Sequence, residues 1–320
     1  MEEAIKNFHT QFAWTPKIVA EVKPPRMHKF VVGGMGGSHL AAGLLAGSKP
    51  ELDIFIHSDY GLPALSDAKE RLYIASSYSG NTEETIDFAQ DALKSGYAVA
   101  TISVGGKLLE FAKRNNLPRI ILPDTKIQPR SALGFSILAL ARIIGDEELL
   151  AELLAFSVKL QPSALEKNGS ELAKTLAGKV PVIYASTRNQ SIAYNWKIKF
   201  NETGKIPAFY NVFPEINHNE MTGFDVISQT RKLSAPFHFI FLTDSADNPQ
   251  IQKRMKVCEK LYEDRGLLVT EAPLVGDTAL LKVFTSLLVA DWTALHLSRH
   301  YGTEAEQVPM VEQFKKLVGS

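Results

Sequence analysis

RLYIASSYSGNTEET, residues 71–85, begins with an apolar run, continues through a turn rich in serine and threonine, and ends in a helical pattern. Strand, turn and helix in this order form the first half of a βαβ unit. Further apolar runs at 29–32, 52–57, 98–102 and 120–122 are separated by stretches with helical periodicity. Strands and helices that alternate in this way predict parallel crossovers and a doubly wound sheet.

The second half of the chain repeats this alternation. Its predicted strands are 180–185, 237–242 and 267–270. The predicted helices along the chain are 38–46, 82–95, 131–144, 190–200, 249–263 and 279–301. Residues 149–174 also have a helical pattern and are expected to bridge the halves. We therefore expect an α/β protein of two doubly wound parallel-sheet domains, 1–148 and 149–320, the second with a C-terminal helical tail.

The composition is that of a globular protein without a charge excess. Hydrophobic residues make up 45% and charged residues 22%, and Lys plus Arg (35) equals Asp plus Glu (35). A nucleic-acid-binding protein normally carries a basic excess, so that class is disfavoured. An anionic ligand must then be met by local donors. With one cysteine, Cys258, and no signal-peptide or membrane-spanning pattern, we expect a cytoplasmic protein without disulfides or membrane contact.

A glycine-rich turn, GGMGGS at 33–38, follows the first predicted strand and precedes a helix. Glycines there let the backbone turn tightly and approach a ligand, and the helix N-terminus offers free N–H groups to an anion. His39 stands where a dinucleotide-binding G-x-G-x-x-G motif has its third glycine, which weakens a nucleotide interpretation. The alternative is a plain tight turn between strand and helix.

The hydroxyl-rich turn, SSYSGNT at 76–82, also lies between a strand and a helix. Ser77, Ser79 and Thr82 can donate to phosphate oxygens, and the residue between them, Gly80, removes a side-chain obstruction. The turn has no P-loop lysine, which favours holding a phosphate ester over cleaving a nucleoside triphosphate. The alternative is a helix cap made by Ser79 or by Asn81, which accounts for one hydroxyl and not for the others.

Residues 77–85, SYSGNTEET, resemble the phosphosugar-binding loop of the sugar isomerase (SIS) domain family. The resemblance implies a five-stranded parallel sheet flanked by helices, often present twice in one chain. It also implies a bound sugar phosphate. The residues that would hold its phosphate are Gly37, Ser38, Ser77, Ser79 and Thr82.

Glu202 follows the predicted helix at 190–200 and stands between Asn201 and Thr203. Aldose–ketose isomerisation needs a base, commonly a carboxylate, that moves a proton between C2 and C1. A partly desolvated glutamate near an anion would have a raised pKa suited to this task. From the residues alone, an exposed glutamate at a helix end is the simpler interpretation.

Two further stretches, WKIKFNETGK at 196–205 and YNVFPEINHNE at 210–220, strongly resemble the bifunctional phosphoglucose/phosphomannose isomerases. That resemblance implies that Glu202 is the base and that His218, reached from the partner subunit, assists opening of the sugar ring. It also implies that Arg130 stabilises the enediolate, a role suited to a fixed guanidinium. Without the resemblance, a packing histidine and a surface-loop arginine are the simpler interpretations.

The tail at 308–315, VPMVEQFK, resembles the C-terminal run of the same family, which ends in an active-site lysine. Lys315 is the residue that matches, and the adjacent Lys316 is the alternative. A lysine on a surface helix explains the same pattern.

The resemblance therefore implies an aldose–ketose isomerase of glycolysis and gluconeogenesis. It would interconvert glucose 6-phosphate or mannose 6-phosphate with fructose 6-phosphate through a cis-enediolate. The family implies a homodimer and implies neither a metal nor a cofactor. The alternative from a different class is a non-catalytic sugar-phosphate-sensing SIS protein, which would not need Glu202, His218 and Arg130 together. An amino-sugar isomerase of the same family is the third possibility.

Overall fold

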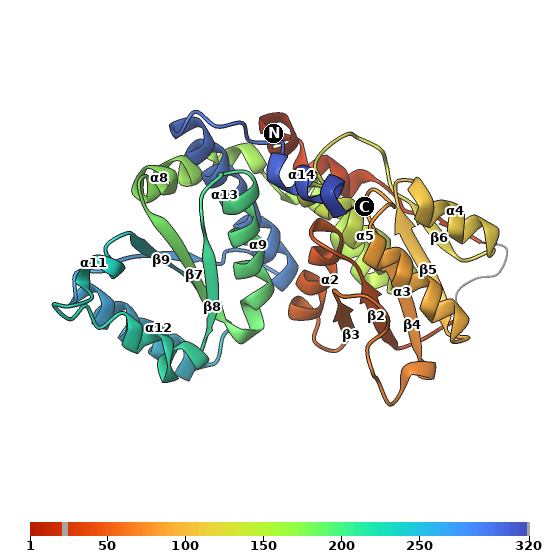
Figure 1. The fold of residues 1–320 in the computed structure, drawn as a ribbon, viewed down its shortest axis with the longest axis horizontal. Helices are drawn as coiled ribbons and strands as arrows, with labels where there is room; N and C mark the ends of the chain where they lie inside the picture. Colours follow the sequence, from red (N-terminus) through yellow and green to blue (C-terminus); the bar gives the residue numbers. More distant parts are fainter. Residues whose placement is uncertain (21–24, 319–320) are drawn as a thin grey trace. The chain divides into compact units, whose positions relative to one another are not determined.

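The computed structural model describes residues 1–20 and 25–318, and Figure 1 shows its helices and strands. The chain divides into two compact units. The N-terminal unit is Lys6–Leu160 together with the tail from Val308. The C-terminal unit is Gln161–Gln307 together with Met1–Ile5. Each unit contains one predominantly parallel sheet with helices packed on it, so the predicted fold class is confirmed.

The N-terminal unit has a six-stranded sheet in the order β1-β6-β5-β4-β2-β3. All neighbours are parallel except β1 and β6. The strands are β1 (Ile18–Val19), β2 (Lys29–Gly33), β3 (Asp53–His57), β4 (Arg71–Ser76), β5 (Ala98–Ser103) and β6 (Arg119–Ile121). The five predicted strands are present, and β1 was missed because two residues carry no readable pattern.

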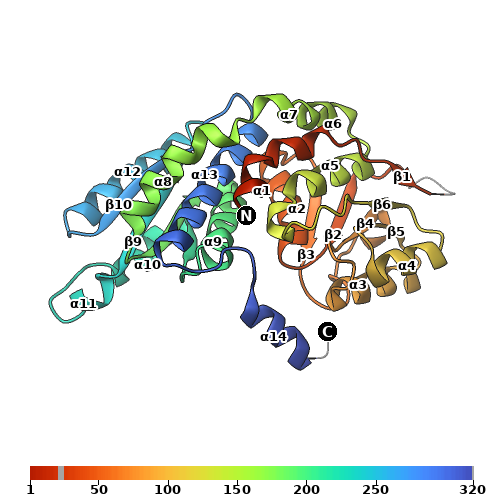
Figure 2. The same cartoon turned by 90° about the horizontal axis from the view of Figure 1, so that it is seen from above.

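Helices cover both faces of this sheet, with α3 and α4 on one side and α2 and α5 on the other (Figure 2). Phe88 of α3 and Phe111 of α4 are buried against Val31 and Tyr73 of the sheet. All six residues of β4 are buried, as expected of a central parallel strand. The helices are α2 (Gly37–Ser48), α3 (Glu83–Lys94), α4 (Gly106–Arg114), α5 (Leu133–Ile144), α6 (Glu147–Leu154), α7 (Phe156–Lys159) and α14 (Pro309–Val318), with 3-10 turns η1 (Phe8–Ala13), η2 (Ala68–Glu70) and η3 (Pro129–Ser131).

The C-terminal unit has a four-stranded parallel sheet in the order β10-β9-β7-β8. Its strands are β7 (Val180–Ser186), β8 (Phe209–Phe213), β9 (Phe237–Thr243) and β10 (Leu268–Pro273). Sequence reasoning missed β8 because it is an edge strand that contains Asn211 and buries only Phe213. The order matches β5-β4-β2-β3 of the N-terminal unit, so the two sheets share a topology, although the family led us to expect five strands here.

The helices of the C-terminal unit fall into two groups. Met255 and Tyr262 of α12 pack against the sheet beside Tyr184 and Phe239. Helix α13 packs along α8 and α9. The helices are α8 (Glu166–Leu176), α9 (Gln190–Glu202), α10 (Glu220–Gly223), α11 (Arg231–Ser234), α12 (Pro249–Glu263) and α13 (Ala279–His300), with α1 (Glu2–Lys6) at the first unit boundary and 3-10 turns η4 (Pro162–Leu165), η5 (Thr187–Asn189) and η6 (Glu215–His218).

Helix α13 is, among the described residues, the one helix long and apolar enough to cross a membrane. Most of it is buried inside its own unit, where Trp292 is fully enclosed and its indole Nε1 donates to the carbonyl of Pro162 at 2.8 Å. The length and apolar composition of α13 are therefore those of a core helix.

Residues 149–174 do not form the single bridging helix that the periodicity predicted. Helix α6 ends at Leu154, α7 ends at Lys159, and Pro162 opens a 3-10 turn before α8 begins. A proline has no N–H to continue a helix, which explains the break. Because α6 and α7 pack on α5 and η1, the N-terminal unit extends to Leu160 and not to the predicted residue 148.

A buried histidine joins two strands of the C-terminal sheet. His238 of β9 is 2% exposed, and its Nε2 lies 2.8 Å from the hydroxyl of Thr270 on β10. Burial, with a smaller contribution from Lys179, lowers the pKa of His238 from 6.5 to about 4. Between these two pH values the unfolded chain binds the proton and the folded chain does not, so the protein loses stability as the pH falls through this range.

We expect the free energy of unfolding to fall by about 2 kcal/mol between pH 7.5 and pH 5 because of His238. Urea denaturation at the two pH values measures this. His238→Gln keeps a donor for Thr270 and does not titrate, so the variant should show a pH dependence weaker by that amount. A pH dependence equal to that of the wild type would contradict the assignment.

Candidate functional site

The loops that follow β2 and β4 meet at one edge of the N-terminal sheet. These strands are parallel neighbours, and the chain continues from β2 to β3 on the other side, so the topology reverses between them. Ligands of open α/β sheets bind at such a point. The backbone N–H of Tyr78 donates to Ser38 Oγ at 2.8 Å, and Ser76 Oγ donates to the carbonyl of Ser38 at 3.0 Å. The structure thus brings the glycine turn and the hydroxyl-rich turn together.

The hydroxyls of the second turn form hydrogen bonds within the turn and not to the helix that follows. Ser77 Oγ lies 2.8 Å from Thr82 Oγ1 and accepts the N–H of Gly80 at 3.1 Å. Thr82 is the N-cap residue of α3, yet its side chain makes no capping hydrogen bond within the described chain. Ser79 Oγ accepts the N–H of Asn81 at 3.2 Å. The capping alternative therefore does not account for this turn, and the first N–H groups of α3 are left without a side-chain cap.

Gly80 fixes the shape of this turn. Its φ is +73°, and a Cβ added there would lie 1.8 Å from the carbonyl oxygen of Gly105. The turn is also bonded to the segment after β5, because Val104 N–H donates to the carbonyl of Tyr78 at 2.9 Å and Leu108 N–H to that of Gly80 at 2.8 Å. A larger residue would have to separate the two segments.

The backbone of Arg130 lies next to the glycine turn. Arg130 is 3% exposed, in η3. A Cβ added to Gly37 would lie 2.8 Å from the carbonyl carbon of Pro129 and 2.9 Å from the backbone nitrogen of Arg130. Gly37 is therefore needed for the close approach of α2 to the segment that carries Arg130.

Gln11 holds this segment from the other side, and sequence reasoning missed it. Its side chain is 3% exposed. Nε2 donates to the carbonyl of Ser131 at 2.7 Å, and Oε1 accepts the N–H groups of Gly134 and Phe135 at 3.0 and 3.3 Å. Gln11 thus caps α5 from a distant part of the chain and fixes the turn next to Arg130. A single glutamine in an amphipathic segment gives no sequence signal for such a contact.

The two turns present neutral donors. Residues 34–38 and 77–82 contain no Lys or Arg. Burial raises the pKa of Tyr78 and lowers that of His39, so both stay uncharged near neutral pH. The positive potential that these two turns themselves supply therefore comes from the N-termini of α2 and α3, whose first N–H groups point out of the helices. Such a site suits one compact anion.

Glu202 is the last residue of α9, in the C-terminal unit, and is partly exposed. The end of this helix is held firmly. Lys199 Nζ forms an ion pair with Asp291 of α13 at 2.7 Å, and both residues are buried. Lys205 Nζ donates to the carbonyl of Glu202 at 2.6 Å. These contacts fix the backbone at the end of α9, where Glu202 stands.

His218 lies in the same unit as Glu202 but at the other end of α9. Thr187 Oγ1 donates to the carbonyl of Phe213 at 3.0 Å, which joins the start of α9 to the end of β8. His218 follows β8 in η6, whereas Glu202 ends α9, a helix of 13 residues and about 20 Å. Ile216 of η6 is buried in the cluster with α12, whereas α9 packs on α13. Within one chain, these two side chains do not meet.

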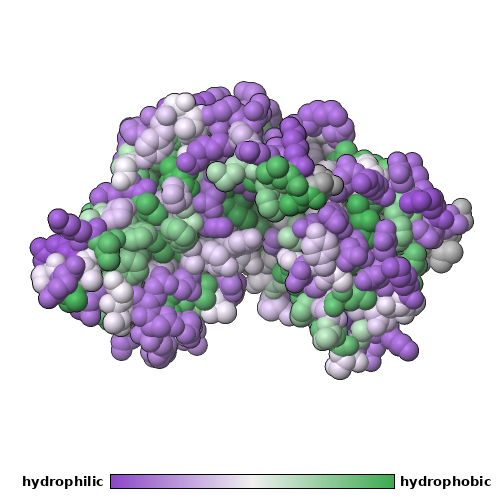
Figure 3. Space-filling model, in the orientation of Figure 1, coloured by the Kyte–Doolittle hydropathy of each residue, from purple (hydrophilic) through white to green (hydrophobic). Residues whose placement is uncertain are grey.

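Lys315 lies on α14, where no described residue is buried. Its Nζ is 3.1 Å from Glu312 Oε1 on the same helix. The apolar side of this helix is at the surface, and Figure 3 shows the apolar patch over α14. Met310 is 83% and Leu317 78% exposed. A helical tail was predicted as part of the C-terminal domain, whereas it groups with the N-terminal unit. The position of Lys315 relative to the other site residues stays a prediction.

The C-terminal sheet carries a different group of residues at the equivalent edge. β7 and β9 correspond to β2 and β4, and the segment that follows β9 contains the buried residues Asp244 and Asp247. Lys282 Nζ lies 2.6 Å from Asp244 Oδ1, and Ser186 Oγ donates to Asp247 Oδ1 at 2.8 Å. Burial opposes ionisation of both, but the bond from Lys282 keeps the pKa of Asp244 low, whereas that of Asp247 is raised. The carboxylates of Asp244 and Asp247 therefore already occupy this edge of the C-terminal sheet.

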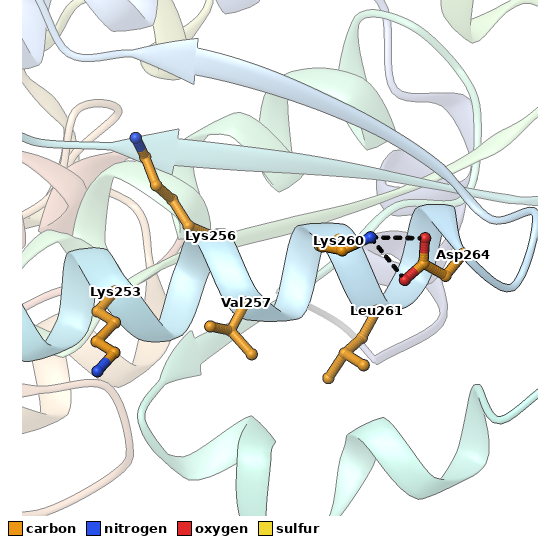
Figure 4. A pocket seen from close by; sticks show the side chains of 6 residues that line it. All are labelled: Lys253, Lys256, Val257, Lys260, Leu261 and Asp264. Carbon is orange, nitrogen blue, oxygen red and sulfur yellow. Dashed lines mark hydrogen bonds and ion pairs between the residues drawn. The ribbon is translucent and has the colours of Figure 1, made fainter.

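A shallow hollow on α12 lies apart from these residues. Its lining residues are Lys253, Lys256, Val257, Lys260, Leu261 and Asp264. Five of them project from α12 and Asp264 follows its last residue, as Figure 4 shows, and Lys260 is paired with Asp264 at 3.0 Å. A single helix face gives no second wall to enclose a ligand, so we assign no function to this hollow.

Solved structures of low sequence identity share this fold. A hypothetical protein from Thermus thermophilus matches with a TM-score of 0.68 at 18% identity, over 99% of this chain and 87% of the other. A putative phosphosugar isomerase from Clostridium difficile 630 matches with a TM-score of 0.67 at 18% identity, over 100% and 95%.

The relatives that match most of the chain at 30% identity or more are bifunctional phosphoglucose/phosphomannose isomerases. Residues 165–318 match the model of the bacterial phospho-glucose isomerase C-terminal SIS domain. The bifunctional phosphoglucose/phosphomannose isomerase of Caldicellulosiruptor bescii is 33% identical over 93% of this chain and 91% of its own length. The enzyme of that name from Aquifex aeolicus is 30% identical over 99% and 98%. Because this similarity extends over nearly the whole of both chains, the protein belongs to the bifunctional phosphoglucose/phosphomannose isomerase family and is an isomerase.

Proposed function

We propose that the protein interconverts glucose 6-phosphate and mannose 6-phosphate with fructose 6-phosphate. The observation that carries this proposal is the hydroxyl-rich turn at the end of β4, which lies against Ser38 and ahead of the uncapped N-terminus of α3. The phosphate binds there to the residues at the starts of α2 and α3. Those residues are Gly37 through its backbone and Ser38, Ser77, Ser79 and Thr82 through their hydroxyls.

One phosphate site in each chain follows from the charges at the two sheet edges. The N-terminal edge offers N–H and O–H donors and no carboxylate side chain between residues 77 and 82. The C-terminal edge holds Asp244 and Asp247, and the negative charge of Asp244 is already met by Lys282. A phosphate there would face a buried carboxylate, which is unfavourable.

Glu202 is the proposed base. Its carboxylate takes the proton from C2 of the open-chain aldose, and the electrons of that C–H bond form the C1–C2 double bond while the C1 carbonyl oxygen becomes anionic. The guanidinium of Arg130 stabilises this charge. The proton then returns to C1, a proton passes from the C2 oxygen to the C1 oxygen, and the ketose results. The same steps give either C2 epimer, depending on which face of C2 receives the proton in reverse.

His218 and Lys315 are the proposed helpers of ring opening. Since Glu202 and His218 lie at opposite ends of α9 in one chain, His218 serves the site of a second copy. The working form is then a homodimer, with each site completed by the partner. We place this enzyme in the cytoplasm, and the buried free thiol of Cys258 suits that reducing compartment.

Replacing Glu202 by Gln should abolish turnover and preserve binding. The amide keeps the shape of the side chain but cannot take the C2 proton, so kcat should fall by at least about 10²–10⁴-fold. A coupled assay with fructose 6-phosphate measures kcat, and calorimetric titration measures binding. Glu263→Gln, a matched change at the last residue of α12, should leave both values unchanged. Turnover near that of the wild type in Glu202→Gln would remove this residue as the base.

Mixing two inactive variants tests the contribution of the partner. Chains that carry Glu202→Gln and chains that carry His218→Ala are refolded together and compared with each protein refolded alone. Random pairing makes about half of the dimers mixed, and each mixed dimer has one site with both native residues, so about a quarter of the wild-type activity should return. Mixed dimers detected by mass spectrometry without recovered activity would contradict action of His218 on the partner.

A further inference from the structure

The segment that carries His218 is bonded to the sheet by one carboxylate. From this geometry we infer that Glu220 is a positioning residue that holds His218 in place for the partner's site. The inference rests on the proposed function, because it assumes that His218 acts in ring opening.

Glu220 receives two hydrogen bonds from neighbouring strands. Tyr184 OH of β7 donates to Glu220 Oε1, and Asn211 Nδ2 of β8 donates to Glu220 Oε2. Tyr184 and Asn211 are directly paired in the sheet register. Bonds from both sides to an ionised carboxylate are among the stronger hydrogen bonds in proteins. They attach Glu220 to the paired strands β7 and β8.

The two donors, Tyr184 and Asn211, could not turn away from Glu220 without losing a hydrogen bond. Tyr184 is fully buried, and burial, together with the nearby Tyr262 and Glu220, raises the pKa of its phenol far above the usual value, so it keeps its proton. Asn211 already uses its carbonyl oxygen to accept the N–H of Val212 at 2.8 Å, which fixes its amide with the NH₂ group toward Glu220. Loss of Glu220 would leave a buried hydroxyl and an amide unpaired.

His218 lies between two fixed points of this segment. Two residues before it, Ile216 is fully buried in the core of the unit. Two residues after it stands Glu220, whose backbone N–H also donates to Asn219 Oδ1 at 2.6 Å. The imidazole itself is exposed. With both neighbours held, the backbone of His218 is fixed while its ring projects outward, as action on a second chain requires.

Glu220→Gln is the first test. The amide has one acceptor oxygen where the carboxylate has two, so either Tyr184 or Asn211 loses its acceptor and the segment would loosen. We expect kcat to fall by about 10-fold to 10²-fold. The KM should change little, because the proposed phosphate donors lie in the other unit. Glu215→Gln, an exposed carboxylate of the same segment, is the matched control and should keep wild-type kcat.

Three results separate positioning from a general loss of structure. Adding Glu220→Gln to His218→Ala should cause no further loss, because the residue acts through His218. Asn211→Asp added to Glu220→Gln reverses donor and acceptor and should restore most of the lost activity. Chains with Glu220→Gln should also restore activity when they are mixed with Glu202→Gln chains, as chains with His218→Ala should. In the mixed dimer, the intact Glu202 of the Glu220→Gln chain works with the intact His218 of its partner. A Glu220→Gln chain whose C-terminal unit had lost its structure would also lose its own Glu202 and would not restore activity.

The opposite results would overturn the inference. These are additive losses in the double variant, no rescue by Asn211→Asp, or failure of complementation. Wild-type protein without any isomerase activity would instead overturn the proposed function, so the two failures are distinguishable.

Discussion

The adjacency of β2 and β4 is the constraint on which the proposed phosphate site depends. Because these strands are parallel neighbours, the residues after each of them must emerge at the same edge of the sheet. Ser38 and Tyr78 are 40 positions apart in the sequence, yet they share a hydrogen bond of 2.8 Å there. At the same edge, Gly80 closely approaches Gly105, which follows the parallel neighbour β5, and Gly37 approaches the backbone of Pro129 and Arg130.

The two sheets show how one topology carries two different chemistries. In the N-terminal unit, glycine and hydroxyl residues leave backbone N–H groups at the edge open to an anion. In the C-terminal unit, Asp244 and Asp247 fill the equivalent place and are satisfied by Lys282, Ser186 and Asn189. The proposed catalytic residues of the C-terminal unit lie elsewhere, Glu202 at the end of α9 and His218 in η6. The repeated topology therefore sets where a site can form, and the residues after the strands decide what it binds.

The parts of this structure that could be predicted are those with local patterns. The buried strand β4 and the hydroxyl-rich turn after it were readable because their residues are contiguous. The break at Pro162 was missed because the helical periodicity continues across it, and β8 was missed because an edge strand with Asn211 lacks an apolar run. Gln11 and Glu220 escaped notice because their partners are distant in the sequence or are ordinary strand residues. The catalytic and binding roles of the predicted site residues stay predictions, since these roles concern contacts with a bound sugar phosphate.

A proton NMR time course of the wild-type protein with fructose 6-phosphate in D₂O tests the central claim most directly. A carboxylate base that exchanges its proton with solvent predicts both glucose 6-phosphate and mannose 6-phosphate as products, with deuterium at C2 in a measurable fraction of each. Conversion without any deuterium at C2 would contradict a proton-transfer mechanism through an exchangeable base. Binding of fructose 6-phosphate without any product would contradict the isomerase account itself.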